Sequence, residues 1–153
     1  MESIDWENLS KADRFEVWLM EMEDVLDRFI EEMPNGLDLD YSPQSLIRLE
    51  EWILNQYPTV GNILKEHEKE KLDSLVRYVG QVYRKELAGK WMIQLDHPKK
   101  DPFYGLPVVY FPGKNVDEIS PHQEVITCVD RRRGDFLYTM FHNVKEENEQ
   151  ESN

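Results

Sequence analysis

Residues 72–91 read LDSLVRYVGQVYRKELAGKW and join a buried helix to the start of a strand. Apolar side chains recur at the spacing that lines one face of a helix: Leu72, Leu75, Val76, Val79, Val82 and Tyr83. Gly89 is placed to adopt the left-handed conformation that ends a helix. The period then changes, because Trp91, Ile93 and Leu95 alternate with Lys90, Met92 and Gln94, as in a half-buried strand. The stretch therefore predicts a central helix that leads directly into a sheet.

The rest of the chain adds two long helices and a second strand. The expected elements are helices over residues 10–33, 43–57 and 68–88 and strands over residues 90–95 and 107–111. Ser42 followed by Pro43 is a typical helix start, and Ser120 followed by Pro121 repeats it before one or two short C-terminal helices. We therefore expect an α+β fold, with the short helices packed on a small antiparallel sheet.

Three segments leave two interpretations open. The alternation in LDLDY, residues 37–41, is compatible with a short strand or with a loop. Residues 59–71 are charged and have few apolar anchors, so they form either a mobile connection or a short helix before the central one. Gly80 costs about 1 kcal/mol relative to alanine inside a helix, and we attribute it to the close approach of another element rather than to a functional kink.

The chain has 153 residues, of which 40% are hydrophobic, and is long and apolar enough to bury a core. We expect one domain over residues 1–144. Residues 145–153 read KEENEQESN and lack apolar side chains, so a disordered acidic tail is predicted there.

The formal net charge is −13, from 31 acidic and 18 basic side chains. Phosphate backbones and anionic lipids repel such a chain, which argues against nucleic acid and membranes as partners and favours a basic protein. The single cysteine, Cys128, cannot form an intramolecular disulfide, and no window approaches the roughly 20 apolar residues of a membrane span. Because the N-terminal residues also lack the pattern of a signal peptide, a cytoplasmic location is expected.

No familiar catalytic or nucleotide-binding motif is present, and no cofactor is expected. The four histidines lack metal-ligand spacing and are interpreted as surface residues: His67, His97, His122 and His142. A nucleophilic cysteine would need a base, which His122 or His142 could supply to Cys128. We favour the simpler interpretation, in which Cys128 is a small buried hydrophobe. The sequence therefore predicts a protein that is not an enzyme.

The first predicted helix carries acidic side chains opposite its apolar face. The candidate partner-binding residues on this face are Glu16, Glu23, Asp24, Asp27 and Glu31. A run of charge on a helix is commonly just a solvated face. The alternative is a docking surface for a basic partner, which would also accelerate association through electrostatic steering.

Three consecutive arginines lie near the expected end of a C-terminal helix: Arg131, Arg132 and Arg133. Cations are favourable at such a helix end, which supports a structural role. The alternative is that the arginines, or Arg84 with Tyr78 and Tyr83, hold an anion, because a guanidinium binds carboxylate and phosphate bidentately. That interpretation places a pocket between the central helix and the sheet.

Two motifs resemble a group of uncharacterised bacterial proteins of similar size. The first is a helix start of the form D-x-S-x-x-S-L, and the second is a helix-to-strand unit. Within about residues 37–142, the matching positions are Asp40, Ser42, Ser45, Leu46, Tyr78, Gly80, Arg84, Gly89 and Trp91. The resemblance implies an α+β fold and a bacterial cytosolic setting and assigns no activity. Similar small acidic proteins are suspected to be immunity or other interaction proteins.

Three functional hypotheses follow. The first is a protein-binding module, immunity-like or regulatory, that presents the acidic helix to a basic partner. The alternative is a small anionic-ligand-binding or catalytic protein with a pocket between the central helix and the sheet. A homo-oligomer joined through apolar residues left over from the helices is the third.

Overall fold

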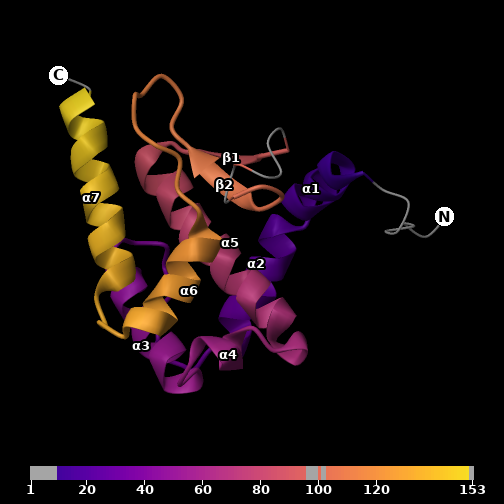
Figure 1. Cartoon of the computed structure of the whole chain (residues 1–153). Coiled ribbons are helices and arrows are strands. Elements are labelled where there is room, and N and C mark those ends of the chain that lie inside the picture. Colours follow the sequence, from indigo (N-terminus) through magenta and orange to yellow (C-terminus); the bar gives the residue numbers. More distant parts are fainter. Residues whose placement is uncertain (1–9, 96–99, 101–102, 152–153) are drawn as a thin grey trace.

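The computed structural model describes residues 10–95, 100 and 103–151 and shows an α+β fold, as predicted. In chain order its elements are helices α1 (Lys11–Met20), α2 (Met22–Glu32), α3 (Ser45–Gln56) and α4 (Val60–Ile63), the 3-10 turn η2 (Glu66–Glu68), helix α5 (Lys69–Leu87), strands β1 (Lys90–Ile93) and β2 (Pro107–Tyr110), and helices α6 (Pro121–Arg131) and α7 (Phe136–Glu151). Helix α5 runs through the middle, with α2 on one side and α6 and α7 on the other (Figure 1).

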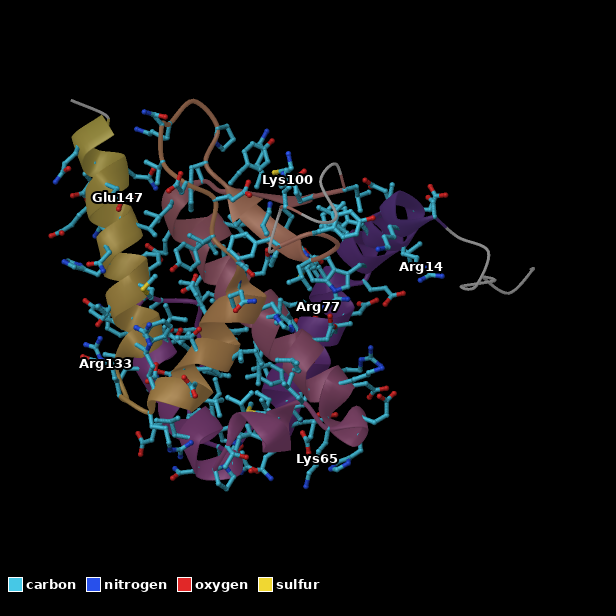
Figure 2. The ribbon with its side chains drawn as sticks, in the orientation of Figure 1. Arg14, Lys65, Arg77, Lys100, Arg133 and Glu147 are labelled. Carbon is cyan, nitrogen blue, oxygen red and sulfur yellow. The ribbon has the colours of Figure 1, made fainter. Side chains whose placement is uncertain are left out.

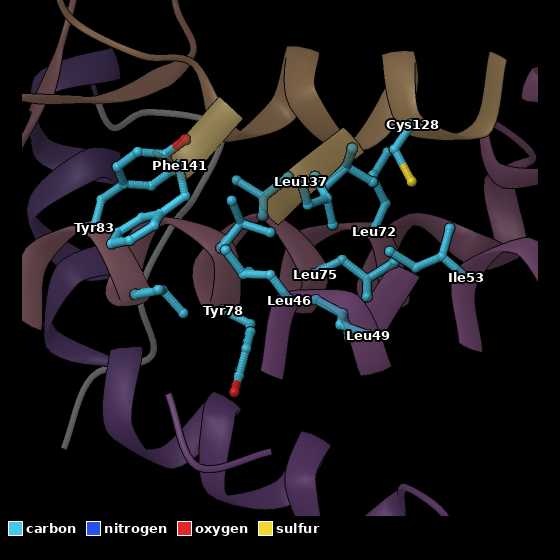
Figure 3. Close-up of a cluster of buried hydrophobic side chains, with 14 of the residues drawn as sticks. Leu46, Leu49, Ile53, Leu72, Leu75, Tyr78, Tyr83, Cys128, Leu137 and Phe141 are labelled. Atoms are coloured by element: carbon cyan, nitrogen blue, oxygen red, sulfur yellow. The ribbon is translucent and has the colours of Figure 1, made fainter. Parts of the chain in front are cut away.

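The core forms around α5, and the buried surface of this helix extends almost all the way round it because polar side chains such as Arg77 and Gln81 are buried as well as its apolar face. Its residues from Ser74 to Tyr83 are all buried. Leu75 lies among side chains of α3 and α7, including Leu46 and Leu137, in the cluster shown in Figure 3. The ring of Tyr78 leaves that cluster with its hydroxyl pointing away from the other labelled side chains (Figure 3). The central helix is therefore the element against which the other helices pack.

The junction between α5 and β1 depends on two glycines that allow close packing. A Cβ atom at Gly80 would lie 2.0 Å from the Trp91 ring, so the close-approach interpretation of Gly80 is confirmed. The prediction that Gly89 ends the helix in a left-handed conformation is wrong, because Ala88 adopts it, with φ 56°. A Cβ atom at Gly89 would lie 2.5 Å from Cγ1 of Val109, which gives the physical reason for glycine there.

The two strands pair antiparallel, as expected, with Lys90 opposite Tyr110 and Ile93 opposite Pro107. Both strands are shorter than predicted and have four residues each. Val109 also exchanges backbone hydrogen bonds of 3.0 and 2.9 Å with Ile119, on the segment that leads to α6. The hairpin thus covers the C-terminal end of α5 and connects it to the C-terminal helices.

The first predicted helix is not continuous, because it breaks at Glu21 into α1 and α2. One turn before the break, the Arg77 side chain of α5 donates a hydrogen bond of 2.7 Å from Nη1 to the carbonyl oxygen of Trp18. A side chain that inserts against the backbone hydrogen bonds of a helix is a known cause of kinks. The prediction of one helix over residues 10–33 is corrected accordingly. At its start, Ser10 caps α1 as predicted by accepting a hydrogen bond from the Asp13 backbone.

The predicted disordered tail over residues 145–153 is corrected for residues 145–151, because α7 continues to Glu151, and residues 152–153 lie outside the described residues. Val144 and Asn148 are both only 7% exposed and extend the buried stripe of this helix by two turns. The Lys114 ammonium also donates to the backbone oxygen of Asn148, at 3.3 Å. The structure thus stabilises these turns by contacts with a distant part of the chain, which local composition does not reveal.

The open segments are also settled in the described part of the chain. Residues 37–41 form a loop rather than a strand, since Asp38 and Tyr41 have positive φ angles of 56° and 64°. Residues 59–68 form α4 and η2, the short-helix alternative, and Thr59 makes a capping box with Asn62. Helix α3 begins at Ser45 and ends before Tyr57, close to the predicted 43–57.

Candidate functional site

The five predicted partner-binding carboxylates are all exposed, but the break at Glu21 divides them between two helices. Glu16 lies on α1. Glu23, Asp27 and Glu31 follow one another at four-residue spacing on α2, so they form one line along that helix. Asp24 lies beside this line. Among the residues that the structure describes, no ion pair involves any of the five, so their charges are available to a partner.

An exposed methionine lies next to these carboxylates. Met20, the last residue of α1, is 81% exposed, more than any other large hydrophobic side chain in the described part of the chain. It is one helical turn from Glu16 and a similar distance along the chain from Glu23 and Asp24. The sequence analysis did not identify Met20. Its position outside the apolar spacing of its helix is the signal that could have found it.

Trp18 of α1 is attached to α5 by a group of partly buried polar contacts. The Asp73 carboxylate accepts hydrogen bonds of 2.7 Å from Nε1 of Trp18 and from Nε of Arg77. The Arg77 guanidinium also stacks over the Trp18 ring, 4.3 Å from its centroid, and is 2% exposed. Arg77 lies near the centre of the molecule in Figure 2. The Trp91 ring also packs against Trp18, at a centroid distance of 4.8 Å and nearly perpendicular to it. This group fixes the position of the acidic helices.

The residues of the D-x-S-x-x-S-L motif meet in one hydrogen-bond network. Asp40 Oδ1 accepts hydrogen bonds from the backbone and the hydroxyl of Ser42, at 3.0 and 2.6 Å. The Ser45 hydroxyl lies 2.7 Å from the Tyr78 hydroxyl, which in turn accepts from the backbone N–H of Tyr41 at 2.9 Å. The network therefore connects the loop before α3 to α5 and accounts for these residue types by fold alone.

Tyr41 places this loop beside the acidic line of α2. Burial raises the pKa of Tyr41 to about 12, and Tyr78 and the carboxylates of Asp27 and Glu23 add to the effect. The Tyr41 ring stacks on Tyr78 at a centroid distance of 4.8 Å, and the Lys85 ammonium lies 4.6 Å from its centroid. The acidic line thus borders a partly buried aromatic residue.

The arginines proposed as an anion site do not converge. Arg84, in the last turns of α5, donates to Gln81, which also accepts from the Trp91 indole. Arg132 is at the other end of the molecule, where its guanidinium donates to the backbone oxygens of Leu54 and Tyr57, both at 2.8 Å.

The other two arginines of the run also make local contacts. Arg131 lies over the Phe136 ring at 5.5 Å, and Arg133 pairs with Asp135 at 3.3 Å. Figure 2 shows Arg133 at the left edge of the molecule, near the C-terminal end of α6. These contacts support the structural interpretation of the arginine run.

Two buried carboxylates were not predicted. Glu50 of α3 is fully buried and accepts a hydrogen bond of 2.8 Å from the backbone of Leu137, in the first turn of α7. Glu124 of α6 is 6% exposed and accepts one of 2.9 Å from the Tyr83 hydroxyl. Burial raises the pKa of Glu124 to about 8, so this carboxyl is largely protonated at neutral pH. Each residue lies within the apolar spacing of its helix, which is the signal that could have found it.

Cys128 is fully buried, as the hydrophobe interpretation requires. Burial raises the pKa of its thiol, and the neighbouring Glu50 carboxyl adds to the effect. A raised pKa opposes formation of the thiolate that a nucleophile needs. His67 and His142 are exposed as predicted, His122 is partly buried, and His97 lies outside the described residues. Within the described ranges, no three histidine, cysteine or acidic side chains are arranged to hold a metal ion.

Comparisons with protein families, with curated proteins and with solved structures find no match to this chain. Among the described residues, no helix combines the length and the apolar character needed to cross a membrane. The candidate site is therefore defined by its geometry: unpaired carboxylates and an exposed methionine on two helices that are firmly attached to the core.

Proposed function

We propose that this chain is a non-enzymatic protein-binding module, of an immunity-like or regulatory kind, in a bacterial cytoplasm. It presents the acidic face of α1 and α2 to a basic protein. The single observation that carries the proposal is Met20, which is 81% exposed and is flanked by carboxylates that make no ion pair with the described part of the chain. An apolar anchor surrounded by charges of one sign is the arrangement that recognises an oppositely charged protein surface.

The two kinds of residue have different parts in this binding. Met20 would enter a pocket of the partner, where its flexible thioether adapts to the shape it meets. Glu23, Asp27 and Glu31 would lie against lysine and arginine side chains, which speeds association and sets orientation more than it adds affinity. Binding would therefore occlude a basic surface of the partner both sterically and electrostatically.

The attachment of α1 and α2 to α5 favours this function. Arg77 and Asp73 already hold Trp18 in place before a partner arrives. Binding by a preorganised surface loses less conformational entropy than binding by a mobile one. The acidic face can thus dock with little rearrangement of its own backbone.

The proposal is tested by affinity purification of the tagged chain from a lysate of the organism that encodes it, at low salt. Bound protein is eluted by rising salt and identified by mass spectrometry. We expect a stoichiometric basic protein that the variant Glu23→Lys/Asp27→Lys fails to retain. The matched control is Glu147→Lys/Glu149→Lys on α7, which changes the net charge equally at exposed residues and is expected to retain it.

With the purified partner, each reversed carboxylate at the interface is expected to cost about 1 kcal/mol of binding free energy. Met20→Ser is expected to weaken binding with no change in the thermal unfolding temperature, whereas the exposed Leu64→Ser is the apolar control. Binding that is insensitive both to salt and to the α2 reversals would exclude the proposed surface.

A further inference from the structure

A groove of about 420 Å³ lies between α1, the N-terminal half of α5 and the hairpin. Its surface is largely apolar. The apolar residues that line it come from all three elements and include Phe15, Trp18, Leu72, Val76, Ile93 and Pro107. Pockets that bind small molecules fall in the range of about 300 to 1,000 Å³ and have mainly apolar linings of this kind. None of the five acidic partner-binding residues lines this groove, so it is separate from the docking face.

The polar residues around the groove are predominantly basic, although the chain as a whole has a net charge of −13. Lys11, Arg14 and Lys69 all line it. Asp73 is the carboxylate in the same lining, and its charge is already balanced by Arg77, at 2.7 Å. A concentration of positive charge around an apolar surface is complementary to a ligand with an apolar body and an anionic end.

Contacts hold the two lysines near the groove but leave them available to an anion. The Lys11 ammonium lies 4.4 Å from the centre of the Tyr104 ring, on the hairpin side. Lys69 pairs with Glu66 at 3.0 Å, but both side chains are at least 70% exposed. Exposed ion pairs contribute little free energy, so an incoming carboxylate can compete for Lys69.

His122, at the start of α6, supplies a further polar group to the lining. Its Nδ1 atom is buried and makes no hydrogen bond within the described residues. Burial lowers the pKa of His122, which keeps its imidazole neutral at physiological pH. A neutral imidazole can donate or accept a hydrogen bond beside the apolar part of a ligand.

We infer that this groove binds a small amphipathic carboxylic acid. The aromatic or aliphatic body of the acid packs against Trp18 and Val76, and its carboxylate pairs with one of the lysines around the groove, Lys11 or Lys69. This site adds a ligand-binding activity to the proposed protein-binding function and does not depend on it.

The test uses 8-anilinonaphthalene-1-sulfonate, an aromatic anion whose fluorescence rises on entering an apolar site, with its sulfonate standing in for the carboxylate. Wild-type protein in its folded state is expected to bind the dye saturably. Lys11→Glu/Lys69→Glu is expected to weaken binding about tenfold, because the charge contact with the anion becomes repulsive at whichever lysine it uses. The matched control Lys90→Glu/Lys145→Glu makes the same change in net charge at exposed lysines outside the groove and is expected to bind within about twofold of wild type.

Competition identifies the chemical class of the ligand. 3-Phenylpropionate is expected to displace the dye, whereas its neutral analogue 3-phenylpropanol is expected to displace it at least tenfold less effectively. Circular dichroism confirms that each variant is folded. Glu23→Lys/Asp27→Lys is expected to bind the dye normally, so failure of the docking proposal and failure of this inference are separate results.

Two results would overturn the inference. The first is absence of saturable dye binding by wild-type protein, and the second is equal loss of binding in the groove variant and its control.

Discussion

The Glu124→Gln variant should become increasingly stable relative to the wild-type protein as the pH rises above 5. Glu124 is 6% exposed, its Oε1 accepts a hydrogen bond from Tyr83, and its Oε2 has no hydrogen-bond partner in the described structure. Burial raises its pKa from an ordinary 4.5 to about 8. Each pKa unit corresponds to about 1.4 kcal/mol, so the whole shift corresponds to at most about 5 kcal/mol.

The sign follows from proton binding. Between pH 4.5 and about 8 the folded state keeps the Glu124 proton while the unfolded chain releases it. The free energy of unfolding therefore falls with rising pH in this window, by up to about 1.4 kcal/mol per pH unit, and this contribution is fully present only below pH 4.5. Glutamine has a similar shape to the protonated carboxyl but does not titrate, so Glu124→Gln removes this dependence.

The assay is urea unfolding at pH 5, 6, 7, 8 and 8.5, followed by circular dichroism. The difference in unfolding free energy between Glu124→Gln and wild type should grow by several kcal/mol from the lowest to the highest pH. Other titrating groups largely cancel in this difference. Glu147→Gln, at an exposed position on α7, is the control and should give a constant difference. If the Glu124→Gln difference is also constant across the series, Glu124 does not hold a proton in the folded state and the argument is refuted.

Three further predictions concern single residues. Gly80→Ala should destabilise the protein by about 2 kcal/mol in urea unfolding, because the new Cβ would lie 2.0 Å from the Trp91 ring; the increase in stability usual for alanine in a helix would contradict the packing. Arg77→Met should cost about 2 kcal/mol in the same assay, because it removes one of the two donors to the partly exposed Asp73 carboxylate and leaves the Trp18 carbonyl without the Arg77 donor; a neutral effect would show that the contact is dispensable. Cys128 should react with iodoacetamide at least about 100-fold more slowly in the folded protein than in urea, and comparable rates would contradict its burial.

Local sequence signals predicted the elements whose determinants are themselves local. The apolar spacing from Leu72 to Tyr83 produced α5, and hydroxyl caps at Ser10 and Ser120 marked the starts of α1 and α6. Gly80 was assigned correctly because a glycine inside a strongly periodic helix has few explanations other than close packing. In each case the residue and its physical cause lie within a few positions of one another.

The features that escaped prediction depend on residues far apart in the chain. The break at Glu21 accompanies a contact with Arg77, and the last turns of α7 are held by contacts with Lys114. Ala88 rather than Gly89 is the left-handed residue, and the glycine at position 89 is required by its close contact with Val109, on the distant strand β2. Periodicity describes one helix at a time, so it contains no information about which side chain of another element will reach it.

For the candidate site, the exposure of the acidic residues followed from helical periodicity, but their division between two helices did not. Met20 could have been recognised as a misfit in the apolar pattern. The basic groove could not, because Lys11 and Lys69 belong to different helices and come together only through packing around Trp18. Surfaces built from several elements require the tertiary structure.

The contacts of Trp18 with α5 also have a consequence for local unfolding. Helices α1 and α2 cannot separate from the core without exposing Arg77 and breaking two hydrogen bonds, from the Trp18 indole to Asp73 and from Arg77 to the Trp18 carbonyl. The amide hydrogens of α1, α2 and the first half of α5 should therefore exchange with solvent as one cooperative unit. Fraying from the N-terminal side would stop at this tryptophan, and the acidic surface would persist in any partly open state that still retains α5.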